Sequence, residues 1–472
     1  MAVGNLSFEV LLEIFDFYRQ TFHQEKKYER VWNSKNGWFT LAHVCQGWRR
    51  VVLTSPARLH VRLLFTEHRT RKAIAPERLP LLPIIVDYSN GAWTAKAQRR
   101  MVSALAFPDR VCGISFRGDE TGLRKLFGTI NGPFSSLESL ELDFRDHKGS
   151  SRSPPSSLIT TSVHPLPFLR DNDPLPLRRL KYTSEPSPLL LHILSRAKSL
   201  VEIDLCFDEL LSPWSPPFAH LRTMPFLRSL KLQIFIPPVY GELLEGRSGD
   251  VVLLPQLTSL RVIGFSGPVN VLMAEIATPA LQEFQVSLYH NSSILHVRRL
   301  SEFIRDAGIL YSAAQLKFSQ TGLIISMLTP AHSIDDPPFK VVVDEVCSII
   351  QMGSELSAMV SAIEDVFLTV LDLDSTASSR SLLRNHDSWR RFFARFRNVK
   401  ILRIHHNVGT EVVGILRQGD VLPSLEEIEV HTGPPGAPIS KRKQVSILDR
   451  FKPFVVTRQR MGRRVKVCWC AE

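Results

Sequence analysis

The feature that most restricts how this chain can fold is a pattern of apolar residues that recurs from about residue 111 onward. The pattern has the form L-x-x-L-x-L, in which the last two apolar positions are separated by a single residue. Such alternation indicates a short strand with one buried face. Copies start at Val111, Leu137, Leu200, Leu227, Leu257, Leu281, Val399 and Leu425, and weaker ones start near 177, 313 and 368.

The spacing of these copies predicts a repeating architecture. The starts at 200, 227, 257 and 281 lie 27, 30 and 24 residues apart, within or close to the roughly 20–29 residues of a leucine-rich repeat. Six segments carry apolar residues at helical spacing, namely 187–199, 269–277, 297–308, 344–363, 381–396 and 411–419. We therefore predict an α/β fold with a parallel sheet, arranged as an irregular leucine-rich-repeat-like solenoid. An ordinary α/β domain whose strands happen to begin with leucine is the alternative.

The chain is basic, and its charge is unevenly distributed. Its 472 residues carry a formal net charge of +12, with a pI near 9.5. Much of the excess lies in 388–397, 441–443 and 458–466, close to the C-terminus. These clusters indicate either binding to nucleic acid or an anionic surface, or else a solvated face or a nuclear-import feature. No apolar run approaches the roughly 18 residues of a membrane span, and we expect a cytoplasmic or nuclear protein.

The six cysteines predict reduced thiols rather than a disulfide framework. None belongs to a C-x-x-C pair, and most lie in apolar runs, as buried free thiols do. The C-terminal Cys468-Trp469-Cys470 suggests a metal clip, but no second pair of ligands stands near it in the sequence. We therefore expect no metal and no cofactor.

The first residues form a helix with more apolar surface than a small helix can bury. In "LSFEVLLEIFDF", residues 6–17, the clearly polar positions are Glu9, Glu13 and Asp16. A second amphipathic helix is predicted over 38–52, ending before Ser55-Pro56, and the alternation at 59–63 suggests a short strand. The surplus apolar surface needs either the core of the next domain or a protein partner.

These two helices resemble the F-box motif, in particular that of F-box proteins of mushroom-forming fungi. The similarity rests on "LSFEVLLEIFDF" and on "LAHVCQGWRRVVLTSPARL", of which V-C-x-x-W-R at 44–49 is the most specific part. It covers residues 6–64, with Ser7 in place of the expected proline and a longer link between the helices. The resemblance implies binding to the Skp-family adaptor of a cullin ubiquitin ligase through Leu6, Val10, Leu11, Ile14, Phe15, Leu41, Val44, Cys45 and Trp48.

The predicted domain order follows from these segments. Residues 1–64 form the helical F-box domain, 65–110 a linker or first repeat unit, and 111–432 the solenoid. A Ser- and Pro-rich stretch at 145–176 reads as a mobile insertion within the solenoid. Residues 433–472 form a basic C-terminal segment.

The sequence offers no constellation typical of catalysis. It lacks the glycine-rich phosphate loops and the G-x-S-x-G elbow, and we expect no catalytic residues and no enzyme activity. In each strand the residue between the last two apolar positions faces away from the core. Four basic members of this set could bind an acidic or phosphorylated segment of a client, although a solvated sheet face is an open alternative. These are Lys181, Lys231, Arg261 and Lys317.

The combined prediction is a non-catalytic substrate receptor of a Skp–cullin–F-box ubiquitin ligase, acting in ubiquitin-dependent degradation. Its N-terminal helices would bind the adaptor, and its solenoid an unidentified protein client. The alternative is a basic nucleic-acid or chromatin-associated interaction protein that retains an F-box. Salt-sensitive retention on heparin or DNA without adaptor binding would favour that alternative.

Overall fold

The structure is a computed structural model of the whole chain, and it describes the greater part of the N-terminal half and several segments of the C-terminal half. The described residues are 6–21, 37–56, 58–66, 82–88, 95–118, 120–128, 132–144, 174–184, 187–207, 218–235, 251–289, 302–303, 313–318, 322–328, 339–344, 370–375, 387, 390, 393–394, 396–405, 409–417, 421–431 and 441–470. The chain divides into two compact units, unit 1 (Met1–Leu205) and unit 2 (Cys206–Glu472).

Unit 1 begins with helices and continues with parallel strands. Its first helices are α1 (Phe8–Thr21), α3 (Gly37–Val44) and α4 (Gln46–Thr54). The strands are β1 (Leu63–Thr66), β2 (Ile84–Tyr88), β3 (Val111–Arg117), β4 (Ser139–Asp143) and β5 (Arg179–Thr183), and the unit boundary falls within β6 (Glu202–Phe207). From β1 to β5, each strand pairs in parallel with the next one in the sequence.

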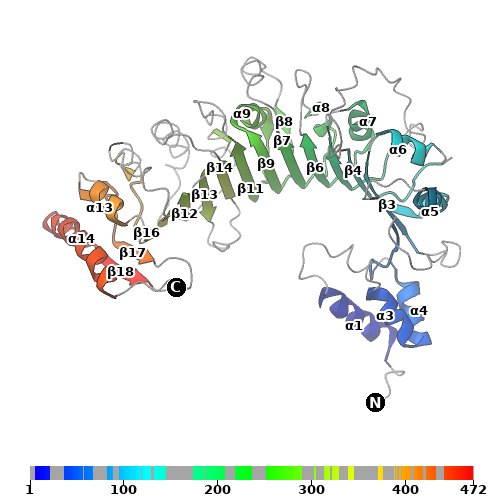
Figure 1. The fold of residues 1–472 in the computed structure, drawn as a ribbon, viewed down its shortest axis with the longest axis horizontal. Helices are drawn as coiled ribbons and strands as arrows, with labels where there is room; N and C mark the ends of the chain where they lie inside the picture. The colour runs from blue at the N-terminus through cyan, green and yellow to red at the C-terminus, as the bar shows by residue number, and fades with distance from the viewer. Residues whose placement is uncertain are drawn as a thin grey trace. The chain divides into compact units, whose positions relative to one another are not determined.

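Helices connect several of these strands, as a parallel arrangement requires. They are α5 (Ala95–Leu105), α6 (Glu120–Phe127) and α7 (Pro188–Arg196). Figure 1 shows α1, α3 and α4 as a group of their own, apart from α5, α6 and α7. Ser187 caps α7, because its side-chain oxygen accepts a hydrogen bond from the backbone N–H of Leu190.

Unit 2 continues the same alternation of strands and helices. Its strands are β7 (Ser229–Ile234), β8 (Val252–Leu253), β9 (Ser259–Phe265), β10 (Ile276–Ala277), β11 (Glu283–Tyr289), β12 (Ala313–Phe318), β13 (Gly322–Leu328), β14 (Phe339–Asp344), β15 (Val370–Ser375), β16 (Ile401–His405), β17 (Glu427–His431) and β18 (Lys466–Cys470). Its helices are α8 (Phe218–Leu221), α9 (Ser266–Glu275), α13 (Gly409–Arg417) and α14 (Lys441–Arg460).

The structure confirms an α/β fold with a large parallel sheet. Strands lie where the L-x-x-L-x-L pattern places them, and α7, α9 and α13 lie on three of the predicted helical segments. On β7 the apolar residues Leu230, Leu232 and Ile234 are all buried. They align with Leu260, Val262 and Gly264 of β9. Lateral alignment of the apolar positions thus gives the strands a shared core.

The segment 313–344 departs from the predicted parallel order. Strand β13 is antiparallel to both β12 and β14, and β14 lies beside β11 while β12 lies beside β15. Only residues 319–321 join β12 to β13. So short a connection permits an antiparallel hairpin but not a parallel crossover. The strand predicted at 313 is present as β12, but β12, β13 and β14 stand in the sheet in the reverse of their sequence order.

Two local predictions in the first 64 residues need correction. The single helix expected over 38–52 is divided at Cys45 into α3 and α4, because Cys45 adopts an extended conformation and its sulfur accepts the Trp48 N–H at 3.5 Å. The strand expected over 59–63 begins only at Leu63. Leu59 and Val61 are nevertheless fully buried, so their alternation reported burial rather than strand structure.

The basic end of the chain is folded over much of its length. Helix α14 buries Ile447, Phe451 and Phe454 along one side, and Arg458 continues that side. The Arg458 guanidinium donates to the carbonyl oxygens of Val421 and Leu422. Of the predicted insertion at 145–176, only 174–176 lie among the described residues. Within the described part of the chain, none of the helices combines the length and apolar character needed to cross a bilayer.

Candidate interaction surfaces

The three N-terminal helices enclose a small core. Phe15 of α1 is fully buried and makes an edge-on ring contact with Trp48 of α4, with 4.8 Å between ring centroids. Trp38 and Leu41 of α3 and Val52 of α4 are also buried. Arg49 of α4 donates from Nε to the carbonyl oxygen of Ala42 at 3.0 Å, which satisfies an acceptor in the last turn of α3.

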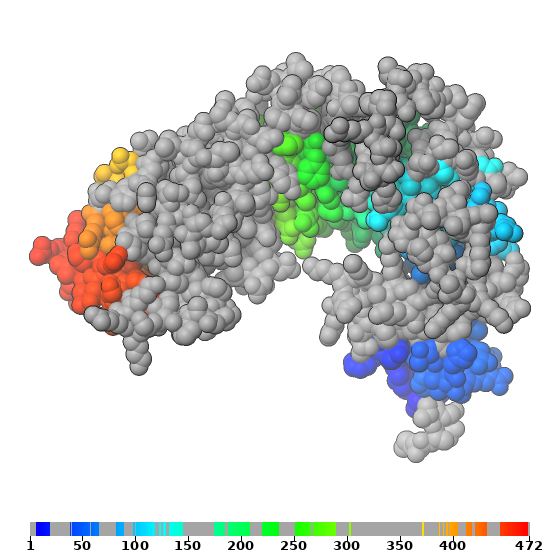
Figure 2. Space-filling view, in the orientation of Figure 1, coloured from blue at the N-terminus to red at the C-terminus, as the bar shows by residue number. Residues whose placement is uncertain are grey.

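A second set of apolar side chains on these helices is not buried. Its members are between 40% and 71% exposed, and they are Leu6, Phe8, Val10, Ile14, Phe17 and Val44. We call these six residues the N-terminal apolar surface. Figure 2 shows the described residues of α1, α3 and α4 as a blue group at the molecular surface. Large exposed apolar side chains gathered on one small helical group are typical of a protein-binding surface.

The nine residues predicted to bind an adaptor therefore fall into two groups. Leu11, Phe15 and Leu41 are buried in the helical core, and Trp48 is half-buried beside them. The exposed group consists of Leu6, Val10, Ile14, Val44 and Cys45. Sequence reasoning left out Phe8 and Phe17, although both belong to the apolar excess of the first helix.

Polar contacts are made at the first turn of α1 and along its middle. Ser7 accepts the N–H of Val10 on its side-chain oxygen at 3.4 Å. The hydrogen bonds that Glu9 makes with its own backbone and with Ser7 lower the pKa of the Glu9 carboxyl. Arg58 forms ion pairs with Glu13 at 2.5 Å and Asp16 at 3.0 Å, and these carboxylates raise the pKa of its guanidinium.

A polar face lies on the other side of the sheet from the buried apolar residues. In unit 1, Asp87, Ser115, Glu141 and Lys181 occupy one register row across β2 to β5. The Lys181 ammonium contacts the Glu141 carboxylate at 2.7 Å, and the Ser115 hydroxyl donates to the same carboxylate at 3.3 Å. Asp87, Ser115 and Glu141 border a cavity of about 200 Å³ that Arg62 and Arg179 also line. The predicted Lys181 is thus already engaged within the chain.

A register row within unit 2 carries like charges. Lys231 of β7 and Arg261 of β9 hold neighbouring positions, followed by Gln285 of β11 and Lys340 of β14. In β12 the row passes through Gln315, which lies opposite Asp372 of β15. Lys317 is therefore not part of this row. Sequence reasoning missed Lys340, although Phe339, Val341 and Val343 around it alternate as a strand does.

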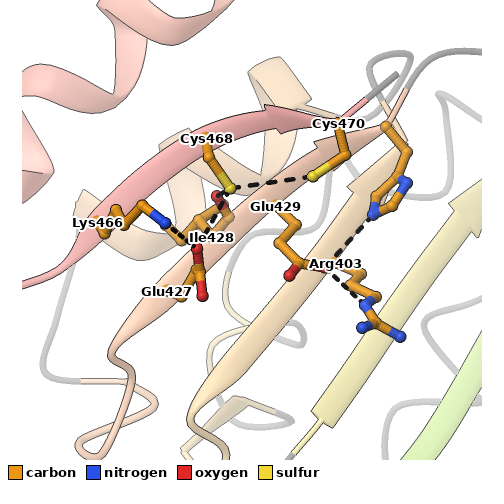
Figure 3. A network of polar contacts seen from close by, with 8 residues as sticks. Arg403, Glu427, Ile428, Glu429, Lys466, Cys468 and Cys470 are labelled. Atoms are coloured by element: carbon orange, nitrogen blue, oxygen red, sulfur yellow. Dashed lines mark hydrogen bonds and ion pairs between the residues drawn. The ribbon is translucent and has the colours of Figure 1, made fainter. Parts of the chain in front are cut away.

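At the end of the unit 2 sheet, β16, β17 and β18 carry a network of polar side chains (Figure 3). Arg403 donates from Nε to Glu429 at 2.7 Å, and His431 Nε2 lies 3.5 Å from the same carboxylate. Lys466 contacts Glu427 at 2.9 Å, and this hydrogen bond lowers the pKa of Glu427 and raises that of Lys466.

Two cysteines belong to this network. The Cys468 sulfur lies 3.4 Å from a carboxylate oxygen of Glu427 and 4.0 Å from the Cys470 sulfur. Burial, and then the hydrogen bonds with Glu427 and Cys470, raise the pKa of the Cys468 thiol to about 12.

Comparison with known proteins adds no relative to this description. No model of a known protein family matches the chain, and no curated protein is significantly similar to it.

Proposed function

We propose that this protein is the substrate-recognition subunit of a Skp–cullin–F-box ubiquitin ligase. In this proposal residues 1–64 are an F-box that binds a Skp-family adaptor, and the sheet that follows is an irregular leucine-rich-repeat-like solenoid that binds a protein client. The observation that carries the proposal is the N-terminal apolar surface, which exposes six large side chains on, or just before, helices that already have a core of their own.

The resemblance and the packing support the same division of roles. The V-C-x-x-W-R segment supplies both Trp48, which packs on Phe15, and Val44, which is exposed. One short motif thus serves the helical core and the surface at the same time. Exposed apolar side chains gain free energy when a partner covers them, at roughly 25 cal/mol per Å² of apolar area.

The order of the strands supports the proposed solenoid. Between β1 and β5, consecutive strands are parallel neighbours, which is the arrangement that stacked strand-and-return units produce. The reversed segment β12 to β14 and the unequal repeat intervals are the reason for proposing an irregular array rather than a regular horseshoe.

The polar face in unit 2 is the proposed client surface. Lys231 and Arg261 are side by side in the register. An acidic or phosphorylated client segment would accept charge-assisted hydrogen bonds from both. Lys181 contributes less in this proposal, because Glu141 already occupies its ammonium group.

The adaptor contact is tested by charging two exposed positions of α1. The double substitution Val10→Asp with Ile14→Asp should abolish co-purification of the full chain with a co-expressed Skp-family adaptor. An unpaired charge buried in an interface costs roughly 3–5 kcal/mol, and each 1.4 kcal/mol or so is tenfold in affinity. Because both side chains are at least 40% exposed in the free chain, its melting temperature should not change.

The matched control is the same double change on an unrelated helix. Val445 and Val456 of α14 are 56% and 45% exposed, so Val445→Asp with Val456→Asp makes the same change in charge and a similar change in hydropathy, and it should leave adaptor binding intact. Adaptor retained by the α1 variant, or lost equally by both variants, would contradict the proposal. Salt-sensitive retention on heparin by an adaptor-free chain would favour a nucleic-acid-binding role instead.

A further inference from the structure

Strand pairing at the C-terminal end of the sheet brings two pairs of metal-ligand residues together. The pairs are Glu429 and His431 on β17, and Cys468 and Cys470 on β18. The two strands are parallel, with Glu429 opposite Cys468 and His431 opposite Cys470. Residues two apart in a strand point to the same face. All four side chains therefore project from one face of two neighbouring strands, as Figure 3 shows for the labelled members.

The distances among Glu429, His431 and Cys470, and between the two sulfurs, are those of a small coordination site. One ligand atom each from Glu429, His431 and Cys470 lie within 4.8 Å of one another. The Cys468 sulfur is 4.0 Å from the Cys470 sulfur. Around a tetrahedral zinc ion with Zn–S bonds of about 2.3 Å, two sulfurs stand roughly 3.8 Å apart. The sulfur pair thus needs only a small adjustment to bind one ion.

We propose that Glu429, His431, Cys468 and Cys470 form a binding site for a zinc-class divalent cation. Thiolate, imidazole and carboxylate are the three ligand types that zinc accepts in proteins. Two sulfurs disfavour Mg²⁺ and Ca²⁺, which prefer oxygen ligands. All four residues are half-buried, so the ion would be partly shielded from water and yet open to entry from the polar face.

The surrounding contacts define what the ion would have to displace. Cys468 would give up its contact with Glu427 at 3.4 Å and its long contact with the carbonyl oxygen of Ile428 at 3.7 Å. Glu429 could keep its bond from Arg403, because a carboxylate has about four acceptor positions. The positive charge of Arg403, held at that carboxylate by this bond, opposes a cation there.

The bound ion would fasten the last strand to the sheet. Strand β18 follows α14 in the sequence, and among the described strands it pairs with β17. Three or four metal bonds across this pair stabilise the strand only when it is in register, so binding raises the stability of the folded end of the chain.

The site is tested with Co²⁺ and Zn²⁺ on the full chain, reduced and stripped with a chelator. Co²⁺ should bind one to one, and it should show the intense visible bands of a tetrahedral ion and the near-ultraviolet band of a thiolate ligand. Zn²⁺ should displace it, and Mg²⁺ should not. The variants Cys470→Ser and His431→Ala should weaken binding about 100-fold or more, since the loss of even an outer partner costs about 10- to 100-fold.

Two further variants keep the test decisive. Cys45→Ser removes an exposed thiol that lies in unit 1, and it should bind Co²⁺ like the unaltered chain. Arg403→Gln retains all four ligands while removing the opposing charge, so it should bind the ion several-fold more tightly. This result can be measured whether or not the Cys470→Ser variant folds.

Three results would overturn the proposal. The first is the absence of thiolate bands at stoichiometric Co²⁺. The second is bands that persist in both Cys470→Ser and His431→Ala. The third is weaker binding in Arg403→Gln. Because adaptor capture is not used as a readout, the outcome is independent of the proposed ligase role.

Discussion

Helix α1 and strand β7 are both rich in apolar side chains, but only the strand buries all of them. Leu230, Leu232 and Ile234 of β7 are each no more than 1% exposed. In α1, Leu11, Leu12 and Phe15 are buried, whereas Val10, Ile14 and Phe17 remain at least 40% exposed. A strand sorts its side chains onto two faces, so alternation places every apolar residue on the core side. Helix α1 has apolar residues around most of its circumference, and α4 covers one side of it.

The largest expected difference in stability is between truncation of a buried and truncation of an exposed phenylalanine of α1. Phe15→Ala should destabilise the N-terminal helices by about 3–5 kcal/mol, because it removes a fully buried ring and leaves a cavity. Phe17→Ala removes the same atoms from a side chain that is 71% exposed, and it should change stability by less than about 0.5 kcal/mol. Hydrogen exchange of the α1 and α4 amides measures both.

Equal losses in the two variants would mean that the exposed side of α1 is packed within the chain after all. The N-terminal apolar surface would then be core, and the proposed adaptor contact would lose its physical basis.

A smaller effect is expected where the strands themselves are closest. A methyl group at Gly264 of β9 would lie 2.5 Å from the carbonyl oxygen of Ile234 on β7. Gly264→Ala should therefore push the two strands apart, at a cost of about 1–3 kcal/mol. The lower melting temperature of the full chain would report the loss.

The helical counterpart should change stability in the opposite direction. At Gly47 in α4 an added methyl group meets only the Cys45 sulfur, at an ordinary 3.8 Å. Gly47→Ala should stabilise by roughly 0.4–1 kcal/mol, because it restricts the unfolded chain.

If Gly264→Ala were neutral, the close approach of β7 and β9 would be incorrect.

The smallest effect concerns the pH dependence of α1. The pKa of Glu9 is lowered by hydrogen bonds with its own backbone and with Ser7, so the carboxylate favours the folded helix. A lowered pKa gives stability that is present above the ordinary value, near 4.3, and that is lost as the pH falls through the folded value. The melting difference between the unaltered chain and Glu9→Gln should thus be constant near neutral pH and shrink in acid.

The matching control for this titration is Glu426→Gln, because Glu426 is an exposed carboxylate of unit 2. That substitution should leave the pH dependence of α1 unchanged. A Glu9→Gln difference that stays the same down to strongly acidic pH would contradict the lowered pKa.

Much of the fold could be predicted because its signals are local. The L-x-L alternation identified β4, β7, β9, β11, β16 and β17, and helical spacing identified α7, α9 and α13. The order of β12, β13 and β14 could not be predicted in this way. A period of two indicates a strand, but it does not say which strand lies next to it or in which direction it runs.

The candidate surfaces divide in the same manner. Local sequence is enough to show that the first helix carries too much apolar surface and that Lys231 and Arg261 point away from the core, because side-chain period is a property of the local backbone. Which side of that helix is buried depends on where α4 packs, and the fold buries Leu11 and Phe15 while leaving Val10 and Ile14 exposed.

The group at the C-terminal strands shows the limit most clearly. Glu429-Val430-His431 and Cys468-Trp469-Cys470 are far apart in the sequence, and neither triplet alone has enough ligands for a metal ion. The parallel register of β17 and β18 places them side by side. Strand pairing is set by hydrogen bonds and burial between distant segments, so the local sequence determines each pair of ligands and the tertiary structure alone determines that the pairs meet.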